Sequence, residues 1–146
     1  MKYLLPAFLA LFPSGAVGAV TCTVSTVPVA FGSYVPSLGT PTDGVGTINI
    51  NCDKAPASNP ISISAGRSGS FTSRTMSNGK SNLSYNLYTS AARTQVWGDG
   101  TGGSAKVSYG GGGAKTFAIT VYGRITALQN VTAGSYSDSL LVTISF

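Results

Sequence analysis

The chain has 146 residues, which is enough for one domain with a buried core. Only 9% of the residues are charged, the net charge is +5, and the sequence contains no histidine and no glutamate. Without histidine there is neither a Ser-His-Asp triad nor a Cys-His nucleophile, so hydrolases of those classes are excluded. The basic residues stand singly instead of forming a patch, so we predict no nucleic-acid partner.

Other routes to catalysis have little support in the sequence. A paired-carboxylate site would need two of Asp43, Asp53, Asp99 and Asp138, and Asp43 and Asp99 each precede a glycine, as in turns. No segment has the residues of a phosphate-binding loop or of a calcium loop. We therefore predict a protein that is not an enzyme and that needs no cofactor, no metal and no small-molecule substrate.

Residues 1–19 have the pattern of a secretory signal peptide. Lys2 is followed by an apolar run over residues 4–12, and small residues at 16–19 fit a cleavage site after Ala19. The apolar run is too short to span a bilayer of about 30 Å, so a membrane anchor is the weaker interpretation. We predict a single exported domain over residues 20–146.

The two cysteines, Cys22 and Cys52, are expected to form a disulfide in an oxidising compartment. Free thiols are less expected there, and two sulfurs without histidine make a poor zinc site. Cys22 begins one alternating apolar segment, residues 22–31, and Cys52 ends another, residues 44–52. We predict that these two segments are paired antiparallel strands, with Val24 opposite Ile50. The inward-facing side chains change from even to odd residue numbers between Val24 and Val27, which predicts a bulge near residues 25–26.

Period-2 alternation predicts further strands at residues 61–65, 83–88 and 117–122, with a short edge strand at 95–97. Residues 66–81 and 100–113 are expected to be loops. The chain ends on an alternating segment, 135–146, whose apolar side carries Leu140, Val142, Ile144 and Phe146. We expect it near the centre of a sheet, with its free edge covered by a strand of this chain or of another chain. Six or seven short strands without helical periodicity predict an all-β sandwich.

The sequence resembles the spore coat protein U family, whose domain also builds archaic, Csu-type chaperone–usher pili. The similarity runs in order along the whole chain after the leader. It includes Cys22, Phe31-Gly32-Ser33-Tyr34, Cys52, Arg74-Thr75-Met76, residues 83–88, Trp97-Gly98-Asp99-Gly100, residues 121–125, residues 134–138 and the closing residues 142–146. Each motif alone is only a strand end or a turn, and it is their joint order that is specific.

The resemblance implies an incomplete immunoglobulin-like β-sandwich that lacks its last strand. In such pilins a periplasmic chaperone first fills the gap with a strand, and a neighbouring subunit later replaces it, a case of β-augmentation. The expected partners are that chaperone, an outer-membrane usher and other pilus or coat subunits at the cell surface. The expected acceptor groove is lined by Val24, Val27, Val29, Phe31, Leu140, Val142, Ile144 and Phe146.

The sequence departs from this pattern at its beginning, because cleavage after Ala19 leaves only Val20 and Thr21 before Cys22. A fibre-forming subunit carries a donor segment there, so we expect this chain to accept a strand without donating one, as a minor or terminal subunit. An alternative is an adhesin-like module that binds glycans or surfaces, as in biofilms, through outward aromatic side chains such as Tyr88 and Trp97.

Overall fold

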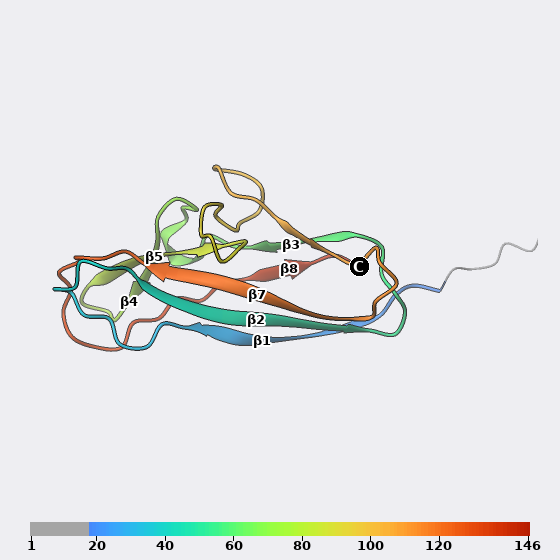
Figure 1. The fold of residues 1–146 in the computed structure, drawn as a ribbon, viewed down its shortest axis with the longest axis horizontal. Helices are drawn as coiled ribbons and strands as arrows, with labels where there is room; N and C mark the ends of the chain where they lie inside the picture. Colours follow the sequence, from blue (N-terminus) through green and yellow to red (C-terminus); the bar gives the residue numbers. More distant parts are fainter. Residues whose placement is uncertain (1–17) are drawn as a thin grey trace, which may run out of the picture.

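The computed structural model describes residues 18–146, which form two packed antiparallel sheets (Figure 1). Most of the predicted signal peptide, residues 1–17, lies outside the described residues. No helix among the described residues is both long and apolar enough to cross a membrane. The strands are β1 (Cys22–Ala30), β2 (Thr42–Cys52), β3 (Asn59–Ile63), β4 (Arg74–Ser77), β5 (Asn82–Tyr88), β6 (Val107–Tyr109), β7 (Thr116–Ile125) and β8 (Val142–Ile144), with one 3₁₀ turn at Gly66–Ser68.

The larger sheet has the order β1-β2-β7-β5-β4, and the smaller has the order β6-β3-β8. Alternate residues of β2 point to the inner face of the larger sheet. Among them, Ile48 is 2% exposed and Ile50 is 0% exposed. Ile61 and Ile63 of β3 cover them from the other sheet. The predicted fold class, an all-β immunoglobulin-like sandwich with one disulfide, is confirmed, with eight strands instead of six or seven.

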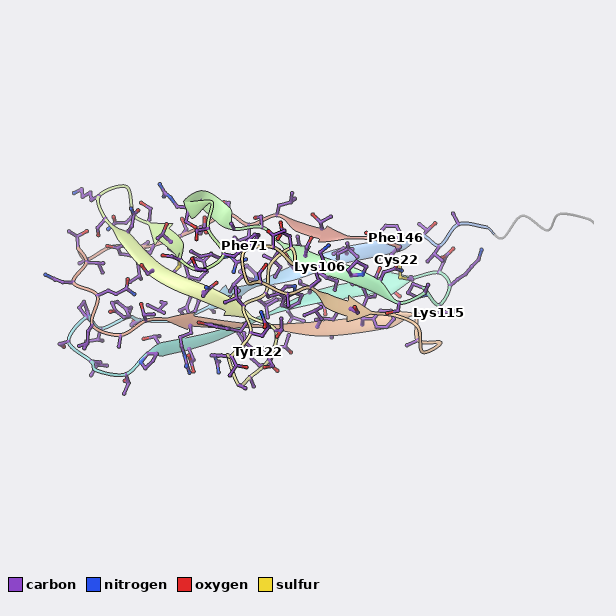
Figure 2. The ribbon with its side chains drawn as sticks, turned by 90° about the horizontal axis from the view of Figure 1, so that it is seen from above. Cys22, Phe71, Lys106, Lys115, Tyr122 and Phe146 are labelled. Atoms are coloured by element: carbon purple, nitrogen blue, oxygen red, sulfur yellow. A yellow bond between two sulfur atoms is a disulfide. The ribbon has the colours of Figure 1, made fainter. Side chains whose placement is uncertain are left out.

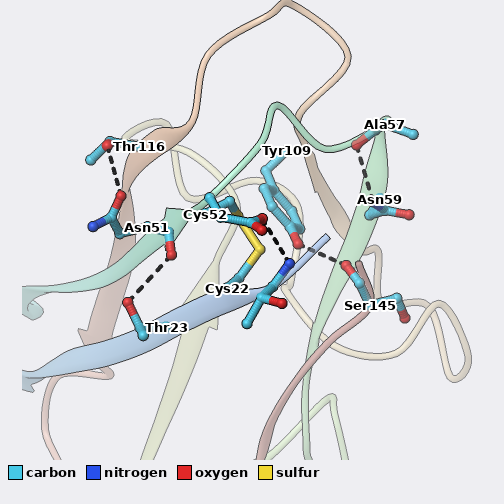
Figure 3. Close-up of a disulfide and its surroundings, with 11 residues drawn as sticks. Cys22, Thr23, Asn51, Cys52, Ala57, Asn59, Tyr109, Thr116 and Ser145 are labelled. Carbon is cyan, nitrogen blue, oxygen red and sulfur yellow. Dashed lines mark hydrogen bonds between the residues drawn. A yellow bond between two sulfur atoms is a disulfide. The ribbon is translucent and has the colours of Figure 1, made fainter. Parts of the chain in front are cut away.

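The disulfide and the register of the first two strands are as predicted. Cys22 is bonded to Cys52, and Val24 lies opposite Ile50 (Figure 3). The bulge occurs later than expected, between Val27 and Ala30. Its position follows from β2, where a Cβ on Gly46 would lie 2.7 Å from the Val27 carbonyl oxygen, so only glycine lets β1 come this close.

Two strands lie where loops were expected. β4 falls inside the segment 66–81, and β6 falls inside the glycine-rich segment 100–113. Both are too short and too polar for their alternation to be evident in the sequence, and each is held by a longer neighbour, β5 and β3 respectively. The expected edge strand at 95–97 is reduced to isolated bridges, from Val96 to Tyr88 and from Trp97 to Ala105.

The prediction for the end of the chain is wrong in one respect. Only Val142–Ile144 of the segment 135–146 forms a regular strand, and β8 lies at the edge of its sheet, not at the centre. β3 pairs with one side of β8, and no strand of the described residues pairs with the other side. An apolar edge strand is therefore left with free main-chain groups.

The two sheets are joined on one side of the sandwich. The Trp97 amide donates to the Leu87 carbonyl of β5, and the Ile63 amide of β3 donates to the Gly98 carbonyl, so residues 97–98 connect one sheet to the other. Ser77 and Ser137 exchange two main-chain hydrogen bonds, which attach the segment before β8 to the edge of β4. No comparable bridge joins β1 to β8 within residues 18–146, so this side stays open.

A buried cation lies where the sheets are joined. Arg74 of β4 has 0% exposure, and its guanidinium donates to the Ser64 carbonyl at 2.9 Å, the Trp97 carbonyl at 2.7 Å and Asn86 Oδ1 at 2.7 Å. Burial lowers the pKa of Arg74, an effect that Tyr85 and Asp138 oppose, but arginine stays protonated in proteins. Its charge is thus held by dipoles from both sheets, and the Phe71 ring lies 5.3 Å from Cζ.

We expect Arg74→Met to lower the free energy of unfolding by about 3–5 kcal/mol, because it leaves buried carbonyl and amide oxygens without donors. Urea unfolding of the protein, refolded in vitro at low concentration, measures the loss. Arg67→Met is the matched control, since Arg67 is exposed on the 3₁₀ turn and should change the free energy by less than about 0.5 kcal/mol. Equal effects of the two substitutions would show that the buried guanidinium does not join the sheets.

We expect replacement of both cysteines by alanine to cost about 3–4 kcal/mol, because the unfolded chain loses a crosslink across a sequence separation of 30. The β1–β2 register has other main-chain bonds, so the double variant should keep the far-UV spectrum of a β protein while its unfolding midpoint falls. An unchanged midpoint would contradict a stabilising role for the disulfide.

Candidate functional site

A groove runs along the open side of the sandwich, between β1 and the segment that leads into β8. One cavity in this groove has a volume of about 380 Å³. The lining comes from β1 and its end, from the inner faces of both sheets, and from the last segment of the chain: Thr26, Val27, Pro28, Val29, Phe31, Thr47, Ile48, Ile63, Met76, Tyr85, Leu87, Val121, Tyr136, Ser137, Asp138, Leu140 and Val142.

A second cavity of about 600 Å³ continues the groove towards the end of the molecule where the loops after β1 and β7 lie. The two cavities share Val29, Phe31, Met76 and Tyr136, so they form one continuous depression. One wall of the second cavity comes from residues 32–36, which follow β1, and the other wall comes from residues 131–136. Residue numbers rise along one wall as they fall along the other, so the two walls are antiparallel.

The floor of the groove is the hydrophobic core itself. Ile48, Leu87 and Val121 come from three neighbouring strands, and their alternate positions place them on the same inner face. They are 5% exposed or less, so the groove is narrow above them. Phe31 lies over the backbone of Gly44 and Gly123, where a Cβ atom would collide with its ring.

The free edge of β1 presents main-chain groups to this groove. The Asp53 amide donates to the Thr21 carbonyl, whereas the Cys52 amide donates away from β1, to Lys115. Because N–H and C=O groups alternate sides along a strand, the odd-numbered residues of β1 up to Val27 bond to β2. Cys22, Val24 and Thr26 therefore direct their N–H and C=O groups to the free edge.

The opposite wall has the same property. The Ser64 amide donates to the Leu141 carbonyl, so Leu141 and Thr143 bond towards β3. By the same alternation, Leu140, Val142 and Ile144 direct their N–H and C=O groups to the free edge of β8. Their side chains face the core on the side of Ile61 and Ile63. The groove thus lies between two rows of main-chain donors and acceptors.

One polar pair supports the wall beside β8. The Tyr85 hydroxyl donates to Asp138 Oδ2 at 2.8 Å, and the Arg67 amide donates to Oδ1 at 3.2 Å. Burial, together with the bond to Asp138, raises the pKa of the Tyr85 phenol far above its ordinary value, so Tyr85 remains a donor at physiological pH. Asp138 therefore holds the segment before β8 against both β5 and the 3₁₀ turn.

The structure brings five of the eight predicted groove residues into the cavity: Val27, Val29, Phe31, Leu140 and Val142. Val24, Ile144 and Phe146 lie outside it, nearer the disulfide end of the molecule, where Figure 2 places Cys22 and Phe146 together. Figure 3 shows at this end the Tyr109 hydroxyl donating to the Ser145 carbonyl at 2.7 Å, which fastens the chain after β8. Val24 and Phe146 are 44% and 55% exposed.

Sequence reasoning missed several residues of the groove lining, among them Met76 and Pro28. Met76 belongs to β4, a strand that was not expected, and Pro28 was passed over inside β1. A signal for Pro28 was present, because proline inside an otherwise regular strand is typical of a free edge. Tyr85 and Leu87 belong to the predicted strand at residues 83–88, and both lie buried on the groove floor.

The predicted aromatic ligand face is not formed. Trp97 has 0% exposure, and its indole N–H donates to the Ile61 carbonyl at 3.1 Å, which places the ring between the sheets. The expectation of an outward Trp97 is therefore wrong, because the segment 95–98 crosses between the sheets. Tyr88 is half-buried on β5, beside Tyr122 of β7.

The aspartates take part in local structure. Asp43 forms a bidentate pair with Arg124, which lowers the pKa of its carboxyl, and it also contacts Arg93. Asp99 accepts from the amide and hydroxyl of Thr101 in a turn. Within residues 18–146 no group of three His, Cys, Asp or Glu side chains is placed to hold a metal ion.

The family model of the Spore Coat Protein U domain matches residues 9–143. The chain belongs to the Spore Coat Protein U domain family. Protein U of Myxococcus xanthus is 30% identical over 128 residues, which cover 80% of this chain and 70% of that protein. The family is named for a spore coat protein. Its match begins inside the predicted leader, so the boundary after Ala19 stays a prediction.

A solved structure with the same fold is the CsuC–CsuE chaperone–tip adhesion subunit pre-assembly complex from the archaic chaperone–usher Csu pili of Acinetobacter baumannii. The TM-score is 0.57 with 18% identity, and the match covers 88% of this chain. This chain spans 40% of the length of the matched chain. The match therefore shows a shared fold.

Proposed function

We propose that this protein is a structural subunit of a bacterial surface assembly whose groove accepts a β-strand from another chain. The observation that carries the proposal is the pair of free edges, on β1 and on β8, that face each other across an apolar cavity. An inserted strand would bond to both edges and place alternate side chains on the groove floor, which is β-augmentation.

The energetics favour such an insertion. Each apolar side chain that is buried contributes about 1.5–3 kcal/mol, and the ordering of the inserted segment subtracts from the sum. The main chain of an inserted strand would also find donors and acceptors on both sides. Because the two walls are antiparallel, the strand would run parallel to one of them and antiparallel to the other.

The proposed partners follow from the family and from the solved neighbour. A periplasmic chaperone would supply the strand during export, and another pilus or coat subunit would supply it in the finished assembly, reached through an outer-membrane usher. The minor or terminal position expected from the sequence depends on cleavage after Ala19 and stays a prediction. The alternative of a glycan-binding aromatic face lacks Trp97, because that side chain is buried.

We expect the exported chain to depend on a chaperone. Expressed alone in a periplasm, it should be degraded or aggregate, because the free edges and the exposed apolar residues Val24, Val27 and Phe146 remain uncovered. Co-expression with the chaperone of an adjacent chaperone–usher locus should yield a 1:1 complex in size-exclusion chromatography with light scattering. Equal accumulation of the soluble chain in the periplasm with and without the chaperone would contradict the proposal.

A pair of substitutions on β8 tests the groove directly. Val142→Lys places a charge in the cavity and should abolish the chaperone complex, because an inserted strand would bury the ammonium without a partner. Thr143→Lys is the matched control, since Thr143 is exposed on the opposite face of the same strand, and its complex should form with wild-type yield. Equal yields for both variants in co-purification would show that the groove is not the binding site.

A further inference from the structure

The outer face of the larger sheet has a row of apolar side chains. Strand pairing places Tyr88 of β5 beside Tyr122 of β7, and Tyr122 beside Val45 of β2. Ala30 of β1 continues the row beyond Val45. Val121 is buried in the core, and because side chains alternate between the two faces of a strand, the row points away from the core. Val45 is 53% exposed and both tyrosines are half-buried, so the row lies at the surface.

The two phenol groups of this row have no protein partner. Among residues 18–146, the hydroxyls of Tyr88 and Tyr122 form no hydrogen bond to another protein group, whereas the other four tyrosines donate to protein oxygens: Tyr34, Tyr85, Tyr109 and Tyr136. Tyrosine has an apolar ring and a polar tip, and it is enriched at surfaces that bind a partner. The row therefore offers apolar rings together with free hydroxyl groups.

Two arginines share one carboxylate beside this row. Asp43 and Arg124 form the next outward-facing pair along β2 and β7. Arg124 Nε and Nη2 bond to Asp43 at 2.7 and 2.9 Å, and Arg93 Nη1 lies 3.3 Å from Asp43 Oδ2. Two guanidinium groups and one carboxylate leave this cluster with a net charge of +1. Within residues 18–146, no acceptor bonds to Arg93 Nη2 or Arg124 Nη1, so their N–H groups are available.

Arg93 is held in place by an uncommon backbone conformation. Its φ is +52°, in the left-handed region that few residues other than glycine adopt. Its Nε donates to the Gly123 carbonyl at 3.2 Å, and its Cζ lies 5.7 Å from the centre of the Tyr122 ring. Such backbone outliers cluster at functional sites, where the surrounding contacts maintain them. The guanidinium is thus positioned beside the aromatic row before any ligand binds.

We propose that the outer face of β2, β7 and β5 binds an acidic polysaccharide, a polymer that contains uronic acid residues. Its carboxylates accept hydrogen bonds from the free N–H groups of Arg93 and Arg124, and its sugar rings pack on Tyr88, Tyr122 and Val45. The surplus positive charge of the cluster favours an anion. The row crosses four strands about 4.8 Å apart, so it is about 14 Å long, which favours an extended polymer over a single sugar.

This site is separate from the groove, because it lies on the outer face of the sheet, so the inference does not rest on the proposed function. A different role for the same residues would be to fasten the loop after β5 to β7, since Arg93 belongs to that loop. The two roles differ in their dependence on a ligand. Fastening the loop requires neither the carboxylates of a polymer nor the ring of Tyr88.

The experiment measures binding to immobilised alginate, a polymer of uronic acids, by surface plasmon resonance. The protein is refolded in vitro at low concentration, and circular dichroism checks that each variant is folded. Carboxyl-reduced alginate is the matched surface, because it keeps the sugar backbone and loses the charges. Arg124→Gln and Tyr88→Ala alter the site. Arg67→Gln is the control for net charge, since Arg67 is exposed on the 3₁₀ turn and outside the cluster.

We expect wild type to bind alginate at low ionic strength, to bind it more weakly as salt is added, and not to bind the carboxyl-reduced polymer. Arg124→Gln should weaken binding by about 5-fold, the upper effect of one exposed ion pair. Tyr88→Ala should weaken it by about 2- to 12-fold, the effect of one aromatic contact. Arg67→Gln should change it by less than about 2-fold.

The inference is wrong if wild type binds alginate no better than the carboxyl-reduced polymer. Equal losses in Arg67→Gln and Arg124→Gln would show attraction by net charge alone, and would also overturn it. Wild-type binding by Tyr88→Ala would assign the cluster to fastening the loop instead.

Discussion

The two sheets of this protein are joined through the buried guanidinium of Arg74. Hydrogen bonds hold strands together within each sheet, but between sheets they are few, and Arg74 supplies those that reach Ser64 and Trp97 from β4. A buried cation is stable only when its donors are matched, and here main-chain carbonyls and Asn86 provide the match. Since no carboxylate bonds to it directly, the geometry of these carbonyls has to be kept, and this fixes how β4, β5 and the end of β3 meet.

The same arrangement explains why the other side is open. The segment after Gly134 bonds to β4 at Ser137 and then joins β3 as β8, so it closes the sandwich next to Arg74 and stops short of β1. Asp138 keeps it there through Tyr85 and Arg67. The gap between β1 and β8 is therefore bounded by a wall that has its own support. Because the groove is preformed, only the partner strand has to become ordered on binding, and the total entropic cost of binding is lower.

The comparisons and the physical description agree on the fold of the molecule. Membership rests on a match over residues 9–143, and the solved neighbour shares the sandwich at 18% identity, too low for individual side chains to be carried over. What the structure adds is the direction of the main-chain groups on the free edges of β1 and β8. These depend on hydrogen-bond pairing and can be derived for this chain alone.

The sequence by itself determined the class of fold, because period-2 alternation and a pair of cysteines are local signals: the strands around Val24, Ile50 and Tyr85 and the Cys22–Cys52 register were predicted from them. It did not determine where polar or lone aromatic residues lie. Arg74 was assigned to a loop and Trp97 to the surface, because their burial depends on carbonyls supplied by distant strands. Nor could alternation tell whether the apolar strand Val142–Ile144 is central or at an edge. That depends on how many neighbours it finds, and only the tertiary structure shows that it has one.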